Sequence, residues 1–199
     1  LGIDKFAEHY KAPLADATID SVSVYFASTS TINPDAEIPM SINKVSASGQ
    51  PGDVLATTSV RAGDLKYDAD SVVATIFHFA EPVEIKKGEE FFVVIGPFPN
   101  GSLETSPYTS DDIAIYCLRR PVGSRSTVWQ YLEDQDDSGV GLGTYQWLEN
   151  VDDPTSMAIA PVISYDKPAS TGISNITSST GTEKKVVAVY SVSGQHTNS

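Results

Sequence analysis

SINKVSASGQPGDVLATTSV (residues 41–60) and SVVATIFHFAEPVEIKKGEEFFVVIG (residues 71–96) decide the fold of this chain. Apolar runs in both stretches, some alternating with polar residues, are interrupted by Gly-Gln-Pro-Gly at 49–52, Glu-Pro at 81–82 and Lys-Lys-Gly at 86–88. Short apolar runs between breaks rich in Gly and Pro are typical of antiparallel strands joined by tight turns. The sequence therefore predicts an all-β fold.

The same rhythm extends along most of the chain. Both alternating faces of residues 71–79 are mostly apolar, which predicts a central strand. The spacing of the other runs is typical of a two-sheet antiparallel β-sandwich of jelly-roll type. Strands are predicted at 5–10, 17–27, 40–45, 54–60, 71–79, 90–95, 113–118, 127–132, 144–148 and 157–164.

The composition changes at Asp166. Residues 1–166 are predicted to form the sandwich, and KPASTG at 167–172 has the Pro, Gly and small polar residues of a linker. Residues 173–199 then contain one clear strand, 186–192, and form a short β appendage. Because a single strand cannot bury itself, it must dock on the sandwich, continue into a longer structure, or self-associate by adding to the sheet of another copy.

Charge and apolar content narrow the classes of partner. Acidic residues outnumber basic ones 26 to 13, for a net charge of -13, which argues against nucleic acid and against an anionic membrane surface. No apolar run approaches the ~18 residues of a transmembrane helix. The lone Cys117 cannot form a disulfide within this chain, and its apolar surroundings predict a buried small side chain.

An acidic loop is the candidate metal site. Asp134, Asp136 and Ser138, followed by Gly139, match the first half of a calcium-binding loop, in which alternate oxygen ligands converge on one cation. The twelfth position is Tyr145 where an EF-hand has a bidentate Glu, so the sequence excludes an EF-hand and leaves a looser, oxygen-ligated calcium site open. The alternative is an acidic, solvated hairpin loop.

Two aromatic pairs flank this loop and are the candidate ligand contacts. If their strands form a hairpin, Trp129, Tyr131, Tyr145 and Trp147 all lie on one of its faces. Exposed rings of this kind stack on sugar rings, while nearby carboxylates accept hydrogen bonds from sugar hydroxyls. The alternative is that the rings belong to the core, as large aromatic side chains usually do.

Catalytic motifs are missing from the sequence. The three histidines have neither metal-ligand nor triad spacing, and neither G-x-S-x-G nor H-E-x-x-H occurs. We therefore expect a protein that is not an enzyme. A jelly-roll glycoside hydrolase stays open as an alternative, because its two carboxylates are defined by their separation in space and not in sequence.

Several short motifs carry resemblances. ATIDSVSVYF at 17–26, GQPGDVLA at 49–56, FAEPV at 79–83, FFVVI at 91–95 and IAPV at 159–162 resemble, in this order, a β-sandwich module of secreted and cell-surface bacterial proteins. Such modules accompany adhesins, sorting domains and secreted peptidases. Further on, VVAVYSVSGQ at 186–195 resembles the opening of a C-terminal sorting domain of the type IX secretion system.

These resemblances imply a secreted or cell-surface protein. The function we expect is that of a non-catalytic exported module, which binds a glycan or a surface protein in cell adhesion. The alternative is a structural accessory domain of a secreted peptidase or other hydrolase, without a ligand of its own.

Overall fold

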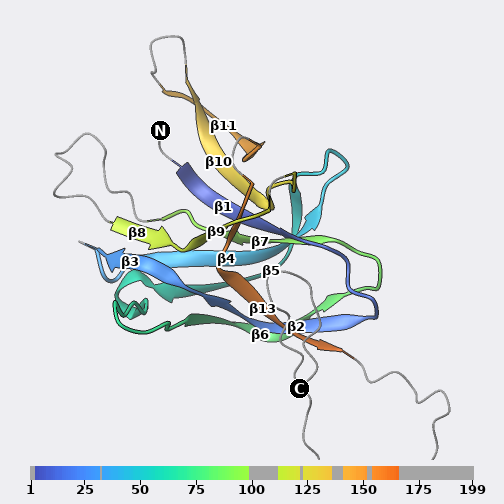
Figure 1. Ribbon diagram of the computed structural model, residues 1–199, viewed down its shortest axis with the longest axis horizontal. Coiled ribbons are helices and arrows are strands. Elements are labelled where there is room, and N and C mark those ends of the chain that lie inside the picture. The colour runs from blue at the N-terminus through green and yellow to red at the C-terminus, as the bar shows by residue number, and fades with distance from the viewer. Residues whose placement is uncertain are drawn as a thin grey trace, which may run out of the picture.

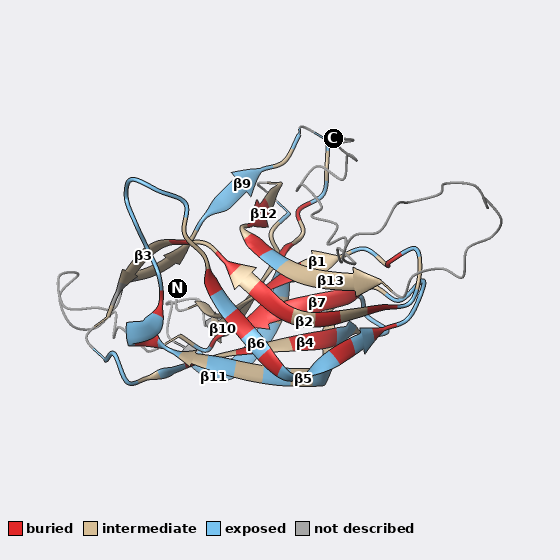
Figure 2. Cartoon of the chain, turned by 90° about the horizontal axis from the view of Figure 1, so that it is seen from below, coloured by how far each residue is buried: buried red, intermediate tan, exposed pale blue. Residues whose placement is uncertain are grey.

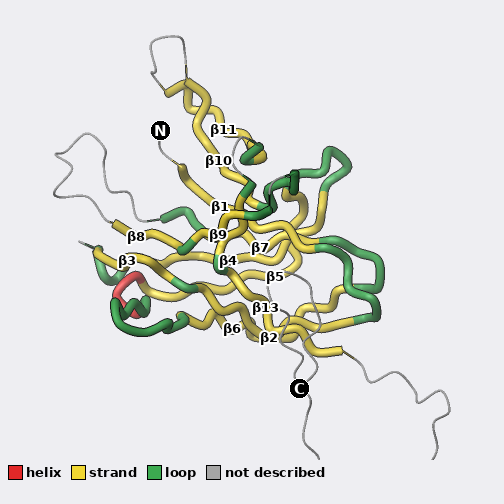
Figure 3. Tube along the Cα trace, in the orientation of Figure 1, coloured by secondary structure: helices red, strands yellow, loops and turns green. Residues whose placement is uncertain are grey.

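The computed structural model describes residues 3–31, 33–98, 112–121, 123–135, 141–151 and 154–165. In this part of the chain the protein is all-β, as predicted, with every paired strand antiparallel. The one helical segment among these residues is the 3-10 turn η1 (Ala62–Asp64), drawn red in Figure 3. The predicted linker and the predicted C-terminal appendage, including the strand at 186–192, lie outside the described residues.

Two larger sheets form the body of the molecule (Figure 1). The six-stranded sheet has the order β11 (Gly141–Glu149), β10 (Val128–Gln135), β1 (Ile3–Tyr10), β7 (Phe91–Ile95), β4 (Glu37–Val45) and β5 (Pro51–Arg61). The three-stranded sheet has the order β13 (Ile159–Tyr165), β2 (Ala17–Val24) and β6 (Thr75–Ile85). Two further pairs are β3 (Phe26–Ser30) with β8 (Asp112–Ile115), and β9 (Cys117–Arg119) with β12 (Thr155–Met157).

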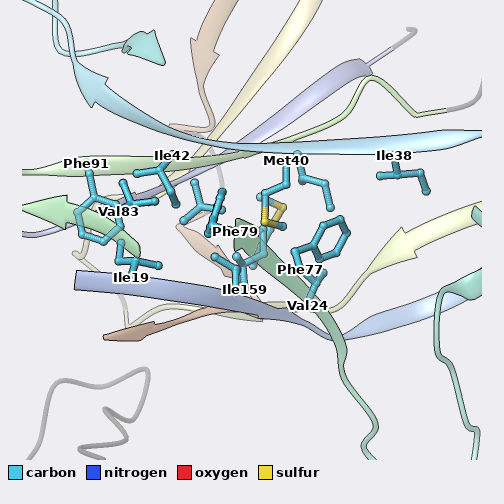
Figure 4. Packing of buried hydrophobic residues seen from close by; sticks show 14 of the residues in the cluster. Ile19, Val24, Ile38, Met40, Ile42, Phe77, Phe79, Val83, Phe91 and Ile159 are labelled. Atoms are coloured by element: carbon cyan, nitrogen blue, oxygen red, sulfur yellow. The ribbon is translucent and has the colours of Figure 1, made fainter. Parts of the chain in front are cut away.

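The main hydrophobic core lies between the two larger sheets. Alternate residues of β4 point inward, so that Ile38, Met40 and Ile42 face the buried side chains of β2 and β6, among them Phe77 (Figure 4). All four of these side chains are at most 1% exposed. Burying an aliphatic or aromatic side chain of this size contributes roughly 1.5–3 kcal/mol, so this cluster supplies most of the driving force for folding.

The central strand is β7 and not the predicted segment at 71–79. All five residues of β7 are buried, because the strand is covered on both faces. Phe91, Val93 and Ile95 enter the main core, while Phe92 and Val94 pack in a second cluster on the opposite face of the sheet. In contrast, β6 lies at the edge of its sheet, and buried and exposed residues alternate along it (Figure 2). Its outward residues His78 and Ile76 are exposed. The prediction of a central strand at 71–79 is therefore wrong.

Three predicted strands are each divided by a single residue, and the three breaks meet. Tyr25 separates β2 from β3, Tyr116 separates β8 from β9, and Ala158 separates β12 from β13. Their backbones form a closed ring of hydrogen bonds, in which Tyr25 N–H donates to Ala158 O (3.0 Å), Ala158 N–H to Tyr116 O (2.8 Å) and Tyr116 N–H to Tyr25 O (3.1 Å). At this junction each of the three chain segments leaves one sheet and enters another.

The predicted burial of Cys117 is also wrong. Cys117 begins β9, whose three residues are all exposed. Its strand pairs only with the short β12 in a two-stranded sheet, so one side of β9 faces solvent. Within the described residues, no helix has the length and apolar character needed to cross a membrane.

Candidate functional site

The two aromatic pairs lie on neighbouring strands of one hairpin, as predicted. β10 and β11 are antiparallel, with Tyr131 opposite Trp147 and Trp129 opposite Glu149. Because side chains alternate along a strand, all four rings lie on the same face of the six-stranded sheet. We call this the outer face, since Val128 and the other core residues of the sheet point to the opposite side. Figure 1 shows the hairpin rising beyond the body of the molecule.

The two tryptophans cover the second hydrophobic cluster. Trp129 and Trp147 are half-buried and pack against Ala7, Phe92 and Val94. The rings of Trp129 and Phe92 meet edge to face, with centroids 5.9 Å apart and an interplanar angle of 89°. The inner sides of both indoles therefore belong to the core, in agreement with the structural interpretation of these residues.

The two tyrosines continue the row of rings toward the tip of the hairpin. The ring centroid of Tyr131 lies 4.9 Å from that of Trp147 and 5.4 Å from that of Tyr145. The two tyrosine rings stack, with 18° between their planes. Lys5 of the neighbouring β1 places its Nζ 5.1 Å from the centre of the Tyr131 ring, in a cation–π contact. Tyr145 is 44% exposed and forms the open end of the row.

Carboxylates flank the exposed end of the row. Glu133 is directly opposite Tyr145 in the hairpin, and its Oε1 accepts a hydrogen bond from the backbone N–H of Gly143 at 2.8 Å. Asp4 lies at the bulge in β1, where the pairing with β10 shifts between Ile3 and Lys5. The charge of Glu133, partial burial and the charge of Asp4, in this order, raise the pKa of the Tyr145 phenol. Strand pairing thus places Glu133 beside the ring of Tyr145.

Polar groups border the row at its other end. The imidazole of His9 stacks on Phe92 with centroids 4.6 Å apart, and its Nε2 lies 2.9 Å from Oε2 of Glu90. Burial lowers the pKa of His9, although Glu90 opposes this shift. Gln50, in the turn between β4 and β5, donates from Nε2 to the carbonyl of Trp147 at 3.5 Å. The turn therefore reaches the backbone of β11.

The calcium prediction depends largely on residues that the structure does not describe. Asp136 and Ser138 lie outside the described residues, whereas Asp134 lies in β10. Its carboxylate accepts hydrogen bonds from Thr144 Oγ1, at 2.9 Å, and from Gln146 Nε2, on the face of the hairpin opposite the four rings. Among the described residues, no group of three or more Asp, Glu, His or Cys side chains is placed to hold a metal ion. Calcium binding stays a prediction.

A buried carboxyl group lies on the opposite side of β1 from the aromatic row. Glu8 is 4% exposed and links β1 to the start of β10 and to β12. Its Oε1 accepts a hydrogen bond from Thr127, and its Oε2 accepts one from the N–H of Met157 at 2.9 Å. Burial raises the pKa of Glu8 to about 7, against the smaller lowering effects of these hydrogen bonds and of Arg120. Nearby, the hydroxyl of Tyr10 donates to the carbonyl of Ile159 at 2.5 Å.

Two shallow hollows lie elsewhere, at the side where the edge strands β5 and β6 approach each other. One, of about 330 Å³, is lined by residues that include Leu55, Ile85 and Phe91. The other, of about 320 Å³, lies between Leu55 and the segment from Glu81 to Glu84. Neither includes any of the four predicted aromatic contacts.

Several residues that surround the aromatic row carry no signal in the sequence pattern. Asp4, Lys5, His9 and Phe92 reach the outer face only because β1 pairs with β10 on one side and with β7 on the other. The alternation of residues 5, 7 and 9 shows that they share a face, but no local pattern indicates which strand lies beside them. Glu133, in contrast, could have been found from the predicted hairpin, since it shares the period of Trp129 and Tyr131.

No protein-family model matches this chain, and comparisons with curated proteins and with solved structures find no significant match.

Proposed function

We propose that this protein is a non-catalytic, exported surface module that binds a glycan through the outer face of the β10–β11 hairpin and serves in cell adhesion. The observation that carries the proposal is the row of rings that ends at the exposed Tyr145, beside the carboxylate of Glu133. Aromatic faces stack on sugar rings, and carboxylates accept hydrogen bonds from their hydroxyl groups. The export and adhesion parts of the proposal rest on the sequence resemblances described above.

The arrangement of the two larger sheets supports a more specific fold type. Two antiparallel sheets face each other across one core, and the chain passes repeatedly from one sheet to the other, as in a jelly-roll β-sandwich. We infer such a sandwich for residues 1–166. Sandwiches of this type present broad sheet faces, on which a ligand can lie across several strands.

A structural accessory domain is the second candidate, and one observation favours it. Trp129 and Trp147 cover Ala7, Phe92 and Val94, so part of the aromatic row has a purely structural use. Under this alternative, Tyr131 and Tyr145 extend the cover over the sheet and bind nothing. The hydrolase alternative gains no comparable support: Glu8, whose raised pKa would suit a general acid, is 4% exposed and is held by Thr127 and Met157.

A glycan-binding assay with one pair of variants distinguishes the two candidates. Tyr145→Ala removes the exposed ring, and Tyr67→Ala is a matched control, because Tyr67 is also 44% exposed but lies between η1 and β6. We expect the wild type and Tyr67→Ala to bind the same glycans on an array, and Tyr145→Ala to bind them at least about tenfold more weakly, which corresponds to about 1.4 kcal/mol. Absence of binding by all three proteins, with and without calcium, would favour the accessory domain.

A further inference from the structure

We infer that the selective end of this binding face consists of Tyr145, Glu133 and Asp4, and that it accepts uncharged sugars in preference to anionic ones. This inference rests on the proposed function and names the class of ligand. It follows from two features of the row of rings. The first is that the other three rings are already in contact with protein, and the second is the sign of the charges around the exposed ring of Tyr145.

The first feature is that Tyr131 is already engaged within the protein. Tyr145 stacks on it, Trp147 contacts it at 4.9 Å, and the Lys5 ammonium group lies 5.1 Å from its centre. Trp147 and Trp129 likewise use part of their surface on the second cluster. Tyr145 stands at the end of the row and is 44% exposed. A sugar ring that stacks on this face therefore meets Tyr145 first.

The second feature is the sign of the charge around Tyr145. Glu133 lies directly opposite Tyr145 in the hairpin, and Asp4 lies beside Lys5 at the bulge of the neighbouring β1. Both charges raise the pKa of the Tyr145 phenol, and neither carboxylate can donate a hydrogen bond when ionised. The hydrogen bond from Gly143 N–H fixes Glu133 in place. The one basic group that the described residues place in the immediate surroundings, Lys5, lies over Tyr131 and 4.0 Å from Asp4.

These charges favour a ligand that donates hydroxyl hydrogen bonds and carries no negative charge. Two carboxylates and one ammonium group leave a net negative charge beside the exposed ring, and the whole chain carries a net charge of -13. At a separation of about 5 Å in a water-like dielectric, each carboxylate weakens the binding of an anionic sugar about fourfold. Salt reduces this discrimination, because the groups are exposed.

Titration calorimetry with hexasaccharides of matched length tests the inference. The neutral probes are the hexaoses of glucose, mannose, galactose and xylose, and the anionic probes are hexagalacturonate and hexamannuronate, all measured at low salt and at high salt. We expect at least one neutral probe to bind about fourfold or more tightly than either anionic probe at low salt. The difference should shrink at high salt.

Charge-neutral variants then locate the source of the discrimination. Glu133→Gln and Asp4→Asn should each raise the affinity for the anionic probes about fourfold at low salt and leave the affinity for the neutral probes nearly unchanged. Glu81→Gln, which removes an equal charge at the exposed edge strand β6, should leave the ratio unchanged. A wild type that binds an anionic probe as tightly as every neutral one would overturn the inference and leave the proposed function standing. If no probe of either class binds, the inference and the proposed function both fail.

Discussion

Replacement of Glu8 by Gln should remove most of the pH dependence of stability between about pH 4.5 and 7.5. Burial raises the pKa of this carboxyl from 4.5 to about 7, so the folded state holds its proton over a range in which the unfolded chain has released it. Stability from such a group is fully present below the unfolded pKa and is lost as the pH rises through the folded pKa. A shift of about 2.5 units corresponds to about 3 kcal/mol, at about 1.36 kcal/mol per unit.

Protonated Glu8 can keep both of its hydrogen-bond partners, although burial and not these hydrogen bonds raises its pKa. A protonated Oε1 can donate to Thr127 Oγ1, which in turn reaches the carbonyl of Thr155 at 3.3 Å, while Oε2 keeps the hydrogen bond from Met157 N–H. The side-chain amide introduced by Glu8→Gln can donate and accept at the same two places. Because of this match, we expect the variant to fold like the wild type and to be more stable than it above about pH 7.

The assay is urea denaturation of the wild type and Glu8→Gln at several pH values from about 4.5 to about 8.5. The free energy of unfolding of the wild type, measured relative to that of the variant, should fall by about 3 kcal/mol as the pH rises through this range. The lowered pKa of His9 makes both proteins more stable as the pH rises, which is opposite to the effect of Glu8. Subtracting the free energy of unfolding of the variant from that of the wild type removes this contribution. The matched control is Glu81→Gln, at an exposed position of β6. A constant difference between wild type and Glu8→Gln would show that Glu8 is ionised throughout, and would refute the reasoning.

Three further substitutions test contacts that hold the molecule together, each by urea denaturation at neutral pH. Tyr10→Phe should cost about 1–2 kcal/mol, because it leaves the buried carbonyl of Ile159 without its donor; an unchanged midpoint would mean that water replaces the hydroxyl. Trp147→Ala should lower the free energy of unfolding by about 2 kcal/mol, since half of a large ring is lost from the second cluster. Tyr145→Ala should lower it by well under about 1 kcal/mol, because Tyr145 is exposed. Equal losses would contradict the division of the row into structural and exposed rings. Gly96→Ala should lower the free energy of unfolding by about 1–3 kcal/mol, because Gly96 has φ +108° and an added Cβ would lie 2.7 Å from the carbonyl oxygen of Asp4. An unchanged free energy of unfolding would show that β1 can move away.

Much of the secondary structure could be predicted from local patterns. The turn between β4 and β5 forms where the sequence places Gly49 ahead of Gln50 and Pro51, and Gly49 has the positive φ (82°) that such a turn requires. The β10–β11 hairpin also forms with the four rings on one face, because the period of two along each strand is a local property.

Sheet membership could not be predicted, because it depends on contacts between distant segments. The breaks at Tyr25, Tyr116 and Ala158 fall inside runs that read as continuous strands, and they occur because three segments change partners at one ring of backbone hydrogen bonds. The apolar character of 71–79 likewise did not indicate a central strand. One face of β6 enters the main core, while exposed Ile76 belongs to the other face at the sheet edge.

The four rings of the candidate site could be predicted from the sequence, but the residues that surround them could not. The sequence places Trp129, Tyr131, Tyr145 and Trp147 on one face, but the second cluster beneath the tryptophans contains Ala7 and Phe92, from strands whose position the pattern does not give. That contact separates the two tryptophans, which support the sheet, from Tyr145, which faces solvent. Burial of Glu8 was equally hidden, since a charged residue in a strand ordinarily faces water.

The central claim is that a glycan binds on the outer face at the β10–β11 hairpin, and its most direct test is a two-dimensional ¹H–¹⁵N NMR titration with the tightest-binding neutral hexaose. The chain has two tryptophans, and both lie in this hairpin, so the two indole N–H signals report on the site without any substitution. We predict shifts of the Trp147 indole signal and of backbone amides around Tyr131, Tyr145 and Lys5, with little change near Leu55 and Ile85. Shifts confined to the hollows beside Leu55, or no shifts at millimolar glycan, would contradict the claim.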